Sequence, residues 1–203
     1  KRVGENETGQ NTGGMGAYSP APIITKILEK KIINKIVKPT LAALKAKKNS
    51  YTGFLYVGLM IKNNEPYLIE YNVRMGDPEC QVIMPRLKTD LVKILSAALK
   101  NKLNKIKIKW NKNKCMTAVL CAKGYPNKYV NNKNIKLPKM KLNHNTFIFH
   151  AGTKFKNNSL VSNGGRVLNI VIMGNNFLKI RNQIFKIIKK INWKHGFYRK
   201  YIG

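Results

Sequence analysis

The sequence predicts an α+β fold, and three observations lead to that prediction. Two strand-like runs at 53–61 and 67–73 are separated by a short connector that contains two Asn and a Pro, which is typical of an antiparallel hairpin. Apolar residues recur at helical spacing over 23–47 and again over 177–191. Three further strand-sized apolar runs within 116–173 predict a second set of strands.

The first half of the chain begins with a loop and continues into a helix. Residues 1–22 are rich in Gly, Asn, Thr and Pro, which predicts an ordered loop. In the helix over 23–47, Pro39 predicts a break or kink because proline has no N–H to donate. After the hairpin, Thr89 is the expected N-cap of a helix over 90–100, whose apolar residues line one face.

We place a domain boundary near residue 103. The stretch 102–114 is rich in Lys and Asn and shows little apolar periodicity, as expected of a connector. The boundary divides the chain into domains at 1–103 and 104–203. The second domain is expected to be a small α+β unit, with strands at 116–122, 147–152 and 166–173 and an amphipathic helix at 177–191.

The net charge of +31 suggests nucleic-acid binding, and the composition offers another explanation. Arg supplies only six of the 39 basic residues, and the remainder are Lys. Lys, Asn and Ile are all encoded by A/T-rich codons, so codon bias would produce this composition without a nucleic-acid partner. The lysines are scattered along the chain. A basic nucleic-acid-binding module is therefore the less favoured alternative, and we expect no nucleic-acid partner.

The cysteines and apolar runs indicate a cytoplasmic protein. With 43% hydrophobic residues the chain can bury a core, and no apolar run approaches the ~20 residues that span a bilayer. The opening is polar and unlike a signal peptide. Cys80, Cys115 and Cys121 contain no CxxC pair, and the three His lack metal-ligand spacing, which favours buried, reduced thiols. We expect no membrane association.

The strand at 67–73 carries the clearest candidate metal ligands. Alternation along a strand places Glu70, Asn72 and Arg74 on one face. A carboxylate beside an amide oxygen suits Mg²⁺, whose remaining positions would be taken by phosphate oxygens and water. The Arg74 guanidinium is suited to a carboxylate or a transferring phosphoryl group.

Two more acidic residues follow directly after this strand. The Gly-Asp-Pro turn presents Asp77, and Glu79 comes two residues later. Only eight acidic residues occur in the chain, yet four of them fall between Glu70 and Asp90. This concentration beside an arginine favours a functional site over an edge strand with solvated charges.

The opening loop is a second candidate binding segment. Gly13 and Gly14 belong to a set of glycines that allows positive φ and close backbone approach to a phosphate or a small carboxylate. Asn11 and Thr12 add side-chain hydrogen-bonding groups. A glycine-rich loop is weak evidence when taken alone, and an ordinary surface loop explains the pattern equally well.

Together these segments closely resemble the phosphoribosylamine–glycine ligases, an ATP-grasp family of purine biosynthesis. The likeness runs in order along essentially the whole chain. It is carried by TGQNTGGMGAYSPAP at 8–22, YTGFLYVGLM at 51–60, IEYNVRMGDPECQ at 69–81, FHAGTK at 149–154, SNGGRVL at 162–168 and FYRKYIG at 197–203.

The resemblance implies a reaction and a set of site residues. Members join glycine to 5-phosphoribosylamine with cleavage of ATP, through glycyl phosphate. The implied fold is the C-terminal half of an ATP-grasp domain, an antiparallel sheet with helices, followed by the small α+β domain. The implied roles are Mg²⁺ (or Mn²⁺) and ATP binding at Glu70 and Asn72, catalysis at Arg74 and Asp77, and substrate binding at Asn11, Thr12, Gly13, Gly14 and Glu79.

The same resemblance implies a missing upstream half, which would hold most nucleotide contacts. We therefore expect the 203 residues alone to be inactive, with that half as a partner. Gln10 and Met75 depart from the family pattern without removing a metal or phosphate contact. Arg166 and Arg199 would reach the substrate phosphate or hold the domain interface, and a packing and pocket-closing role is favoured. Another ATP-grasp ligase and an inactive ligase remnant remain alternatives.

Overall fold

The computed structural model describes residues 2–202, which divide into two compact units. One, here called the sheet unit, contains Lys1–Ser19, Asp77–Leu87 and Trp110–Gly203. The other, here called the hairpin unit, contains Pro20–Gly76 and Lys88–Lys109. Each unit is therefore built from segments that are distant in the sequence. The predicted antiparallel α+β fold class is confirmed, and the boundary near residue 103 remains a prediction.

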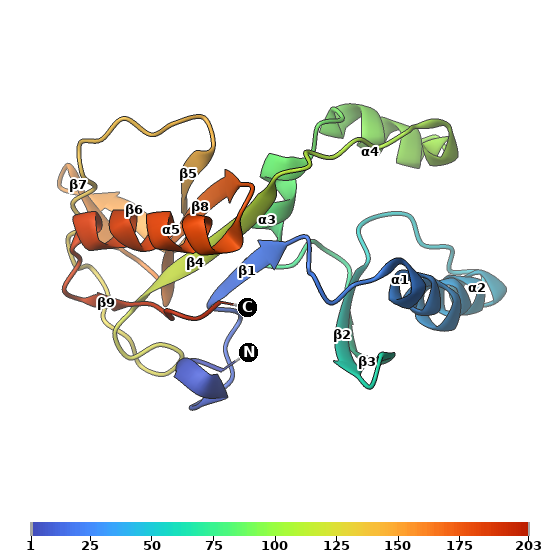
Figure 1. Cartoon of the computed structure of the whole chain (residues 1–203), viewed down its shortest axis with the longest axis horizontal. Helices are drawn as coiled ribbons and strands as arrows, with labels where there is room; N and C mark the ends of the chain where they lie inside the picture. The colour runs from blue at the N-terminus through green and yellow to red at the C-terminus, as the bar shows by residue number, and fades with distance from the viewer. Residues whose placement is uncertain (1, 203) are drawn as a thin grey trace. The chain divides into compact units, whose positions relative to one another are not determined.

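The sheet unit is organised around an antiparallel sheet with strand order β1-β4-β8-β5, and β9 pairs with β4 (Figure 1). A separate two-stranded ladder joins β6 to β7. In chain order the strands are β1 (Gly16–Ser19), β4 (Lys114–Ala122), β5 (Thr146–His150), β6 (Thr153–Lys156), β7 (Ser159–Ser162), β8 (Arg166–Gly174) and β9 (Gly196–Phe197).

Helix α5 (Phe177–Ile191) covers one face of this sheet, as Figure 1 shows. Asn176 begins it as N-cap, its Oδ1 accepting a hydrogen bond of 3.0 Å from the Lys179 N–H. The apolar residues at helical spacing form the buried face, in one cluster with β4 and β8. They are Ile180, Ile184, Ile187, Ile188 and Ile191.

The opposite face of β4 and β8 is covered by helix α3 (Cys80–Ile83), which is followed by the short η3 helix (Met84–Arg86). Val82 packs against Cys115 and Val171, whereas Ile170 lies in the α5 cluster. Because neighbouring residues of a strand point to opposite faces, β8 is buried on both sides. This packing places the turn before α3 next to the sheet, although it follows the hairpin in sequence.

The hairpin unit contains the predicted antiparallel pair. Strands β2 (Tyr56–Lys62) and β3 (Glu65–Asn72) are joined by Asn63 and Asn64, whose φ values of 51° and 59° suit a tight primed turn. Its helices are α1 (Lys26–Ile32), α2 (Lys38–Ala46) and α4 (Leu91–Leu99), with the short η4 (Leu103–Lys105) after α4.

Pro39 does not end the first helix. A π-helical segment η2 (Ile33–Val37) connects α1 directly to α2, so Pro39 stands in the first turn of α2. A proline removes one backbone donor, and the wider π turn accommodates that loss without a break. Of the break or kink predicted here, the break does not occur, and the helix widens locally in the turn before Pro39.

The N-cap of α4 differs by one residue from the sequence prediction. Asp90 is the cap, and its Oδ1 accepts a hydrogen bond of 2.8 Å from the Lys93 N–H. Thr89 instead accepts a hydrogen bond of 2.7 Å from the Lys109 N–H through its hydroxyl oxygen. Thr89 was predicted to cap α4 because no local pattern shows that Lys109 lies next to Thr89 in the fold.

A pH test follows from the contacts of Glu65. Its carboxylate accepts hydrogen bonds from Lys31 and Lys35, which lower its pKa from 4.5 to about 2. Because the folded pKa is the lower one, the stabilisation is complete above pH ~4.5 and is lost as the pH falls toward 2. We expect Glu65→Gln to abolish the pH dependence of α1 amide protection across that interval, measured by hydrogen exchange. Glu29→Gln is the matched control and should retain it.

Candidate active site

The opening loop of the sheet unit is closed on itself by backbone hydrogen bonds. Val3 N–H donates to the Gln10 carbonyl at 2.9 Å, and Arg2 and Asn11 form an antiparallel bridge. The Arg2 guanidinium also donates to the Gly9 carbonyl at 2.9 Å. The loop therefore has a defined base, as expected of an ordered binding segment.

The tip of this loop depends on two glycines. Gly14 has φ +121°, and a Cβ there would lie 2.6 Å from the Cδ of Pro78. Its N–H donates to the Thr12 hydroxyl oxygen at 3.1 Å. Gly13 donates its N–H to the Tyr125 hydroxyl at 3.0 Å, and a Cβ on Gly13 would lie 3.0 Å from the Arg166 Cζ. A side chain at Gly14 is excluded by its backbone conformation and by Pro78, whereas one at Gly13 would require the Arg166 guanidinium to shift.

Arg166 joins the loop to the turn that carries Asp77. Its Nη2 lies 2.8 Å from the Asp77 Oδ2, and its Nη1 donates to the Asp77 carbonyl at 2.9 Å. The same Nη1 donates to the Gly13 carbonyl at 3.2 Å. Gln81 holds the second carboxylate oxygen of Asp77 through an amide hydrogen bond of 3.0 Å. A planar guanidinium satisfies several acceptors at fixed angles, so Arg166 sets the geometry of both segments.

Glu79 completes the turn between Asp77 and α3. It is the residue before α3, and its carbonyl accepts hydrogen bonds from the Val82 and Ile83 N–H groups, both at 3.1 Å. The start of the helix thus fixes the backbone of Glu79, and the Glu79 side chain is half-buried. Glu79 belongs to the same unit as the loop tip at Gly13 and Gly14, the Asp77 turn and Arg166, which are together called the loop-turn assembly.

Cys80 directly follows Glu79 and is not an activated nucleophile. Burial and the nearby Asp77 carboxylate raise the pKa of its thiol, which disfavours the thiolate. Cys115 and Cys121 have pKa values of about 12, raised first by burial. Among the described residues, no disulfide joins any of the three cysteines.

The predicted metal strand is β3 of the hairpin unit. Glu70 and Asn72 are two residues apart on it, opposite Gly58 and Tyr56 of β2, so their side chains share a face. A Cβ on Gly58 would lie 2.9 Å from the Glu70 Cγ, so Glu70 lies across the space that this glycine leaves open. A carboxylate and an amide oxygen on one rigid strand are a donor set that fits a hard divalent cation.

Arg74 lies just past the end of β3, with its side chain largely in solvent. Its Nη1 donates to the Met75 carbonyl at 3.0 Å, a local contact that leaves other donors of the guanidinium exposed.

The predicted site residues therefore form two sets. Glu70, Asn72 and Arg74 belong to the hairpin unit, and the other predicted residues belong to the sheet unit. Within the sheet unit, the structure brings Gly13 and Gly14 against the Asp77 turn. That second set comprises Asn11, Thr12, Gly13, Gly14, Asp77 and Glu79.

Two residues of this assembly carry roles that sequence reasoning did not assign. Arg166 was considered for a phosphate or an interface, and its contacts are with Gly13 and Asp77. Tyr125 was not singled out. The nearest sequence signal was the Gly-Gly pair before Arg166, since a Cβ on Gly165 would lie 2.2 Å from the Tyr125 ring.

Comparison with known proteins links both units to one family. Two family models match in order: phosphoribosylglycinamide synthetase, ATP-grasp (A) domain, at residues 1–80, and the C domain of the same synthetase at 115–203. A phosphoribosylamine–glycine ligase from Agrobacterium fabrum is 44% identical over the whole chain, and one from Haemophilus influenzae is 45% identical.

A solved structure agrees with this similarity. The crystal structure of the phosphoribosylamine–glycine ligase from Thermotoga maritima matches 100% of this chain with a TM-score of 0.88 at 33% identity, covering 50% of that protein. The chain likewise spans about half the length of the curated relatives it matches, 48% in the Agrobacterium and Haemophilus proteins. Within residues 2–202, no helix is long and apolar enough to cross a membrane.

Proposed function

The chain belongs to the phosphoribosylglycinamide synthetase family, and from this we propose that it is the C-terminal part of an enzyme that ligates glycine to 5-phosphoribosylamine. ATP is cleaved to ADP and phosphate in the proposed reaction. The observation that carries the proposal is the intact loop-turn assembly around Arg166, in a chain that both domain models of the family match.

The proposed chemistry has two steps. A carboxylate oxygen of glycine attacks the γ-phosphorus of ATP, forming glycyl phosphate and releasing ADP. The amine of 5-phosphoribosylamine then attacks the acyl carbon, forming the amide and releasing phosphate. Both steps build negative charge on phosphate oxygens, and fixed cations and N–H donors lower the cost of that charge.

Residues of the hairpin unit are proposed to act on the phosphates. Glu70 and Asn72 would hold Mg²⁺ or Mn²⁺, which supplies positive charge beside the nucleotide phosphates. Arg74 is proposed to place its exposed guanidinium against the transferring phosphoryl group. Support comes from the shared face of Glu70 and Asn72 and from the solvent exposure of Arg74.

Residues of the sheet unit are proposed to bind the substrates of the second step. The Asn11 and Thr12 side chains and the backbone at Gly13 and Gly14 offer hydrogen-bonding groups at a narrow loop tip. Asp77 is proposed to orient the reacting amine, held at both carboxylate oxygens by Arg166 and Gln81. Glu79 and its backbone complete this turn. Both roles rest on the family assignment as well as on the geometry.

The upstream half of such an enzyme is the proposed partner of the hairpin unit. This unit contains only two buried apolar side chains, Leu28 and Ala97, among the described residues. Its two-stranded ladder is short of the three strands or the packed face that an independent sheet needs. Large apolar side chains are exposed on it, including Ile27, Met60, Tyr67, Ile69, Val73, Val92 and Leu99. An exposed set of this kind marks a surface that another polypeptide segment covers.

A cytoplasmic location forms part of the same proposal. It is supported by three cysteines that form no disulfide among the described residues and by the small-molecule substrates of the proposed reaction.

The proposal is tested by completing the enzyme. The 203-residue chain alone is expected to release no ADP when given ATP, glycine and 5-phosphoribosylamine. Joined to the upstream half of the Agrobacterium fabrum relative, it should release ADP only when both co-substrates are present. Alanine in place of glycine is the specificity control. A folded, completed enzyme that ligates nothing would contradict the proposed function, and turnover by the chain alone would contradict the need for a partner.

A further inference from the structure

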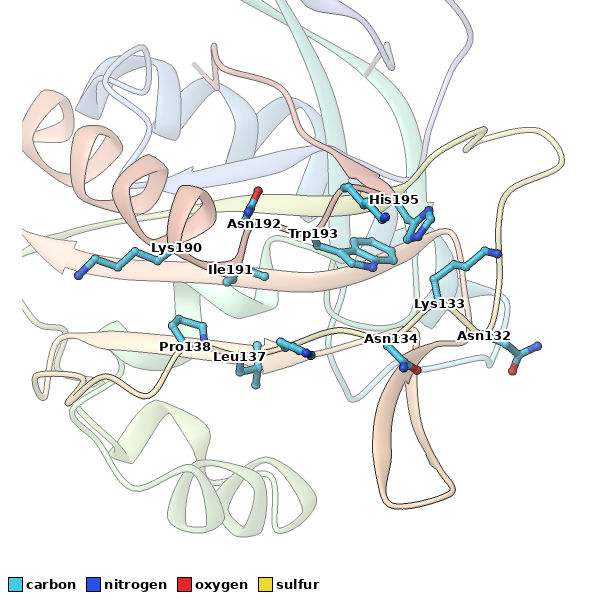
Figure 2. Close-up of a pocket in the computed structure, with 12 residues that line it drawn as sticks. Asn132, Lys133, Asn134, Leu137, Pro138, Lys190, Ile191, Asn192, Trp193 and His195 are labelled. Atoms are coloured by element: carbon cyan, nitrogen blue, oxygen red, sulfur yellow. The ribbon is translucent and has the colours of Figure 1, made fainter.

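A cavity of about 670 Å³ lies in the sheet unit, away from the loop-turn assembly. Figure 2 shows the end of α5 and the residues after it on one side, with the segment 132–138 on the other. No role in the proposed reaction draws on any of its residues. The lining residues are Asn132, Lys133, Asn134, Lys136, Leu137, Pro138, Lys190, Ile191, Asn192, Trp193, Lys194 and His195.

The lining carries uncompensated positive charge. Four of its twelve residues are Lys, and no Asp or Glu is among them. No acidic residue follows Asp90 anywhere in the sequence, so the surrounding segments supply no counter-charge. Two acidic residues of the sheet unit form ion pairs elsewhere, Glu7 with Arg199 and Asp77 with Arg166. Among residues 2–202 none of the four cavity lysines forms an ion pair.

Trp193 adds a buried donor that has no acceptor. Its side chain is only 8% exposed, and its indole N–H has no hydrogen-bond partner among the described residues. The opposite edge of the ring packs against Gly196, where a Cβ would lie 2.4 Å from the Trp193 Cε3. Figure 2 accordingly shows the nitrogen edge toward the segment 132–138. Buried donors in native proteins are nearly always paired, so this orientation points to an acceptor from outside the chain.

The remaining polar groups suit an anion with several oxygens. Asn132, Asn134 and Asn192 provide amide N–H donors around the rim. The pKa of His195 is lowered, first by burial and then by Lys133, Lys194 and Lys123, so its ring is neutral at pH 7 and can donate one N–H. Of these lysines, Lys133 and Lys194 also line the cavity, so both can act on a ligand bound there.

We propose that this cavity binds a small phosphate-bearing anion. Phosphate offers several acceptor oxygens and more than one negative charge, which matches a lining that contains four lysines, no carboxylate and an indole N–H. The volume falls in the range of about 300–1,000 Å³ that small-molecule sites occupy. A nucleic acid fits less well, because the Trp193 ring is buried and presents no face for a base to stack on.

Intrinsic fluorescence of Trp193 provides the test. Trp110 is the only other tryptophan, so the Trp110→Phe variant of the full chain reports on Trp193 alone. Inorganic pyrophosphate and ADP are titrated separately. The chloride concentration is lowered as each ligand is added, so that the ionic strength stays constant. We expect a saturable change in emission for pyrophosphate. Tighter binding of ADP would identify a nucleotide as the ligand, and equal affinity would identify the phosphate group alone.

Matched double variants locate the binding. Lys133→Ala/Lys194→Ala removes two cavity charges, and Lys154→Ala/Lys156→Ala removes two charges from strand β6 outside the cavity. Losing two charge-assisted contacts should weaken pyrophosphate binding by about tenfold or more, whereas the β6 variant should change it by less than about twofold.

Three results would overturn the proposal. One is a titration without saturation. Another is equal weakening by both double variants, which would show that only the overall charge attracts anions. The third is a single-stranded oligonucleotide that binds more tightly than pyrophosphate and is insensitive to Lys133→Ala/Lys194→Ala. Circular dichroism of each variant confirms that the comparison is between folded proteins.

Discussion

Glu70→Gln is expected to lower kcat of the completed ligase by about 10²–10³-fold, the scale measured for removing one electrostatic contact to a transition state. The change keeps the size of the side chain and removes the charge that would hold a divalent cation beside Asn72. Because Glu70 is exposed on β3, the loss of charge should leave folding intact. The measurement is glycine-dependent ADP release at several Mg²⁺ concentrations.

A carboxylate from the same unit provides the control for that experiment. Glu29 is exposed on α1, so Glu29→Gln makes the same chemical change away from β3. It should keep its kcat within about twofold, as surface substitutions usually do. High Mg²⁺ should recover part of the Glu70→Gln activity, because a weakened site fills again by mass action. Unchanged activity in Glu70→Gln would remove Glu70 from the proposed metal site.

Arg166→Lys is expected to lower kcat/KM by about 100-fold, the loss that follows a displacement of reacting groups by about 1 Å. Lysine keeps the charge, but its single ammonium cannot reach the Gly13 carbonyl and both acceptors of Asp77 in the observed arrangement. The loop tip and the Asp77 turn would therefore lose their shared anchor. Steady-state kinetics for glycine and for 5-phosphoribosylamine measure the effect.

The position of Arg166 makes this a test of geometry more than of stability. Its ion pair with Asp77 is partly exposed, so we expect the melting temperature to change little. Arg181→Lys on α5 is the matched control and should be neutral in both measurements. A large fall in melting temperature with unchanged kinetics in the remaining folded enzyme would make Arg166 a packing residue only.

Elements with strong local patterns were predicted close to their observed bounds. The apolar run at 116–122 became β4, the run at 166–173 became β8, and the helix at 177–191 is α5. Each of these elements could be predicted from its own periodicity or continuous apolar run, because the residues that it buries lie close together in the sequence. The β2–β3 hairpin was predicted for the same reason, with its Asn-Asn turn as the local signal.

Local patterns did not predict how segments that are distant in the sequence pack together. Strand β1 pairs with β4, which is about a hundred residues later, and α3 covers the same sheet after a long excursion through the hairpin unit. The capping of α4 by Asp90 also depends on such a return, since the Lys109 N–H engages the Thr89 hydroxyl.

By itself the sequence determined the fold class, the family, and the residue types of the proposed site, because strand alternation and conspicuous glycine-rich and acidic segments are written in consecutive residues. Only the tertiary structure decided that Arg166 and Tyr125 hold the loop tip, that Gly14 lies against Pro78, and that lysines and a buried indole N–H surround one cavity. These are contacts between segments far apart in the chain. Their geometry arises from the register of the sheet and the packing on its two faces, which no local pattern specifies.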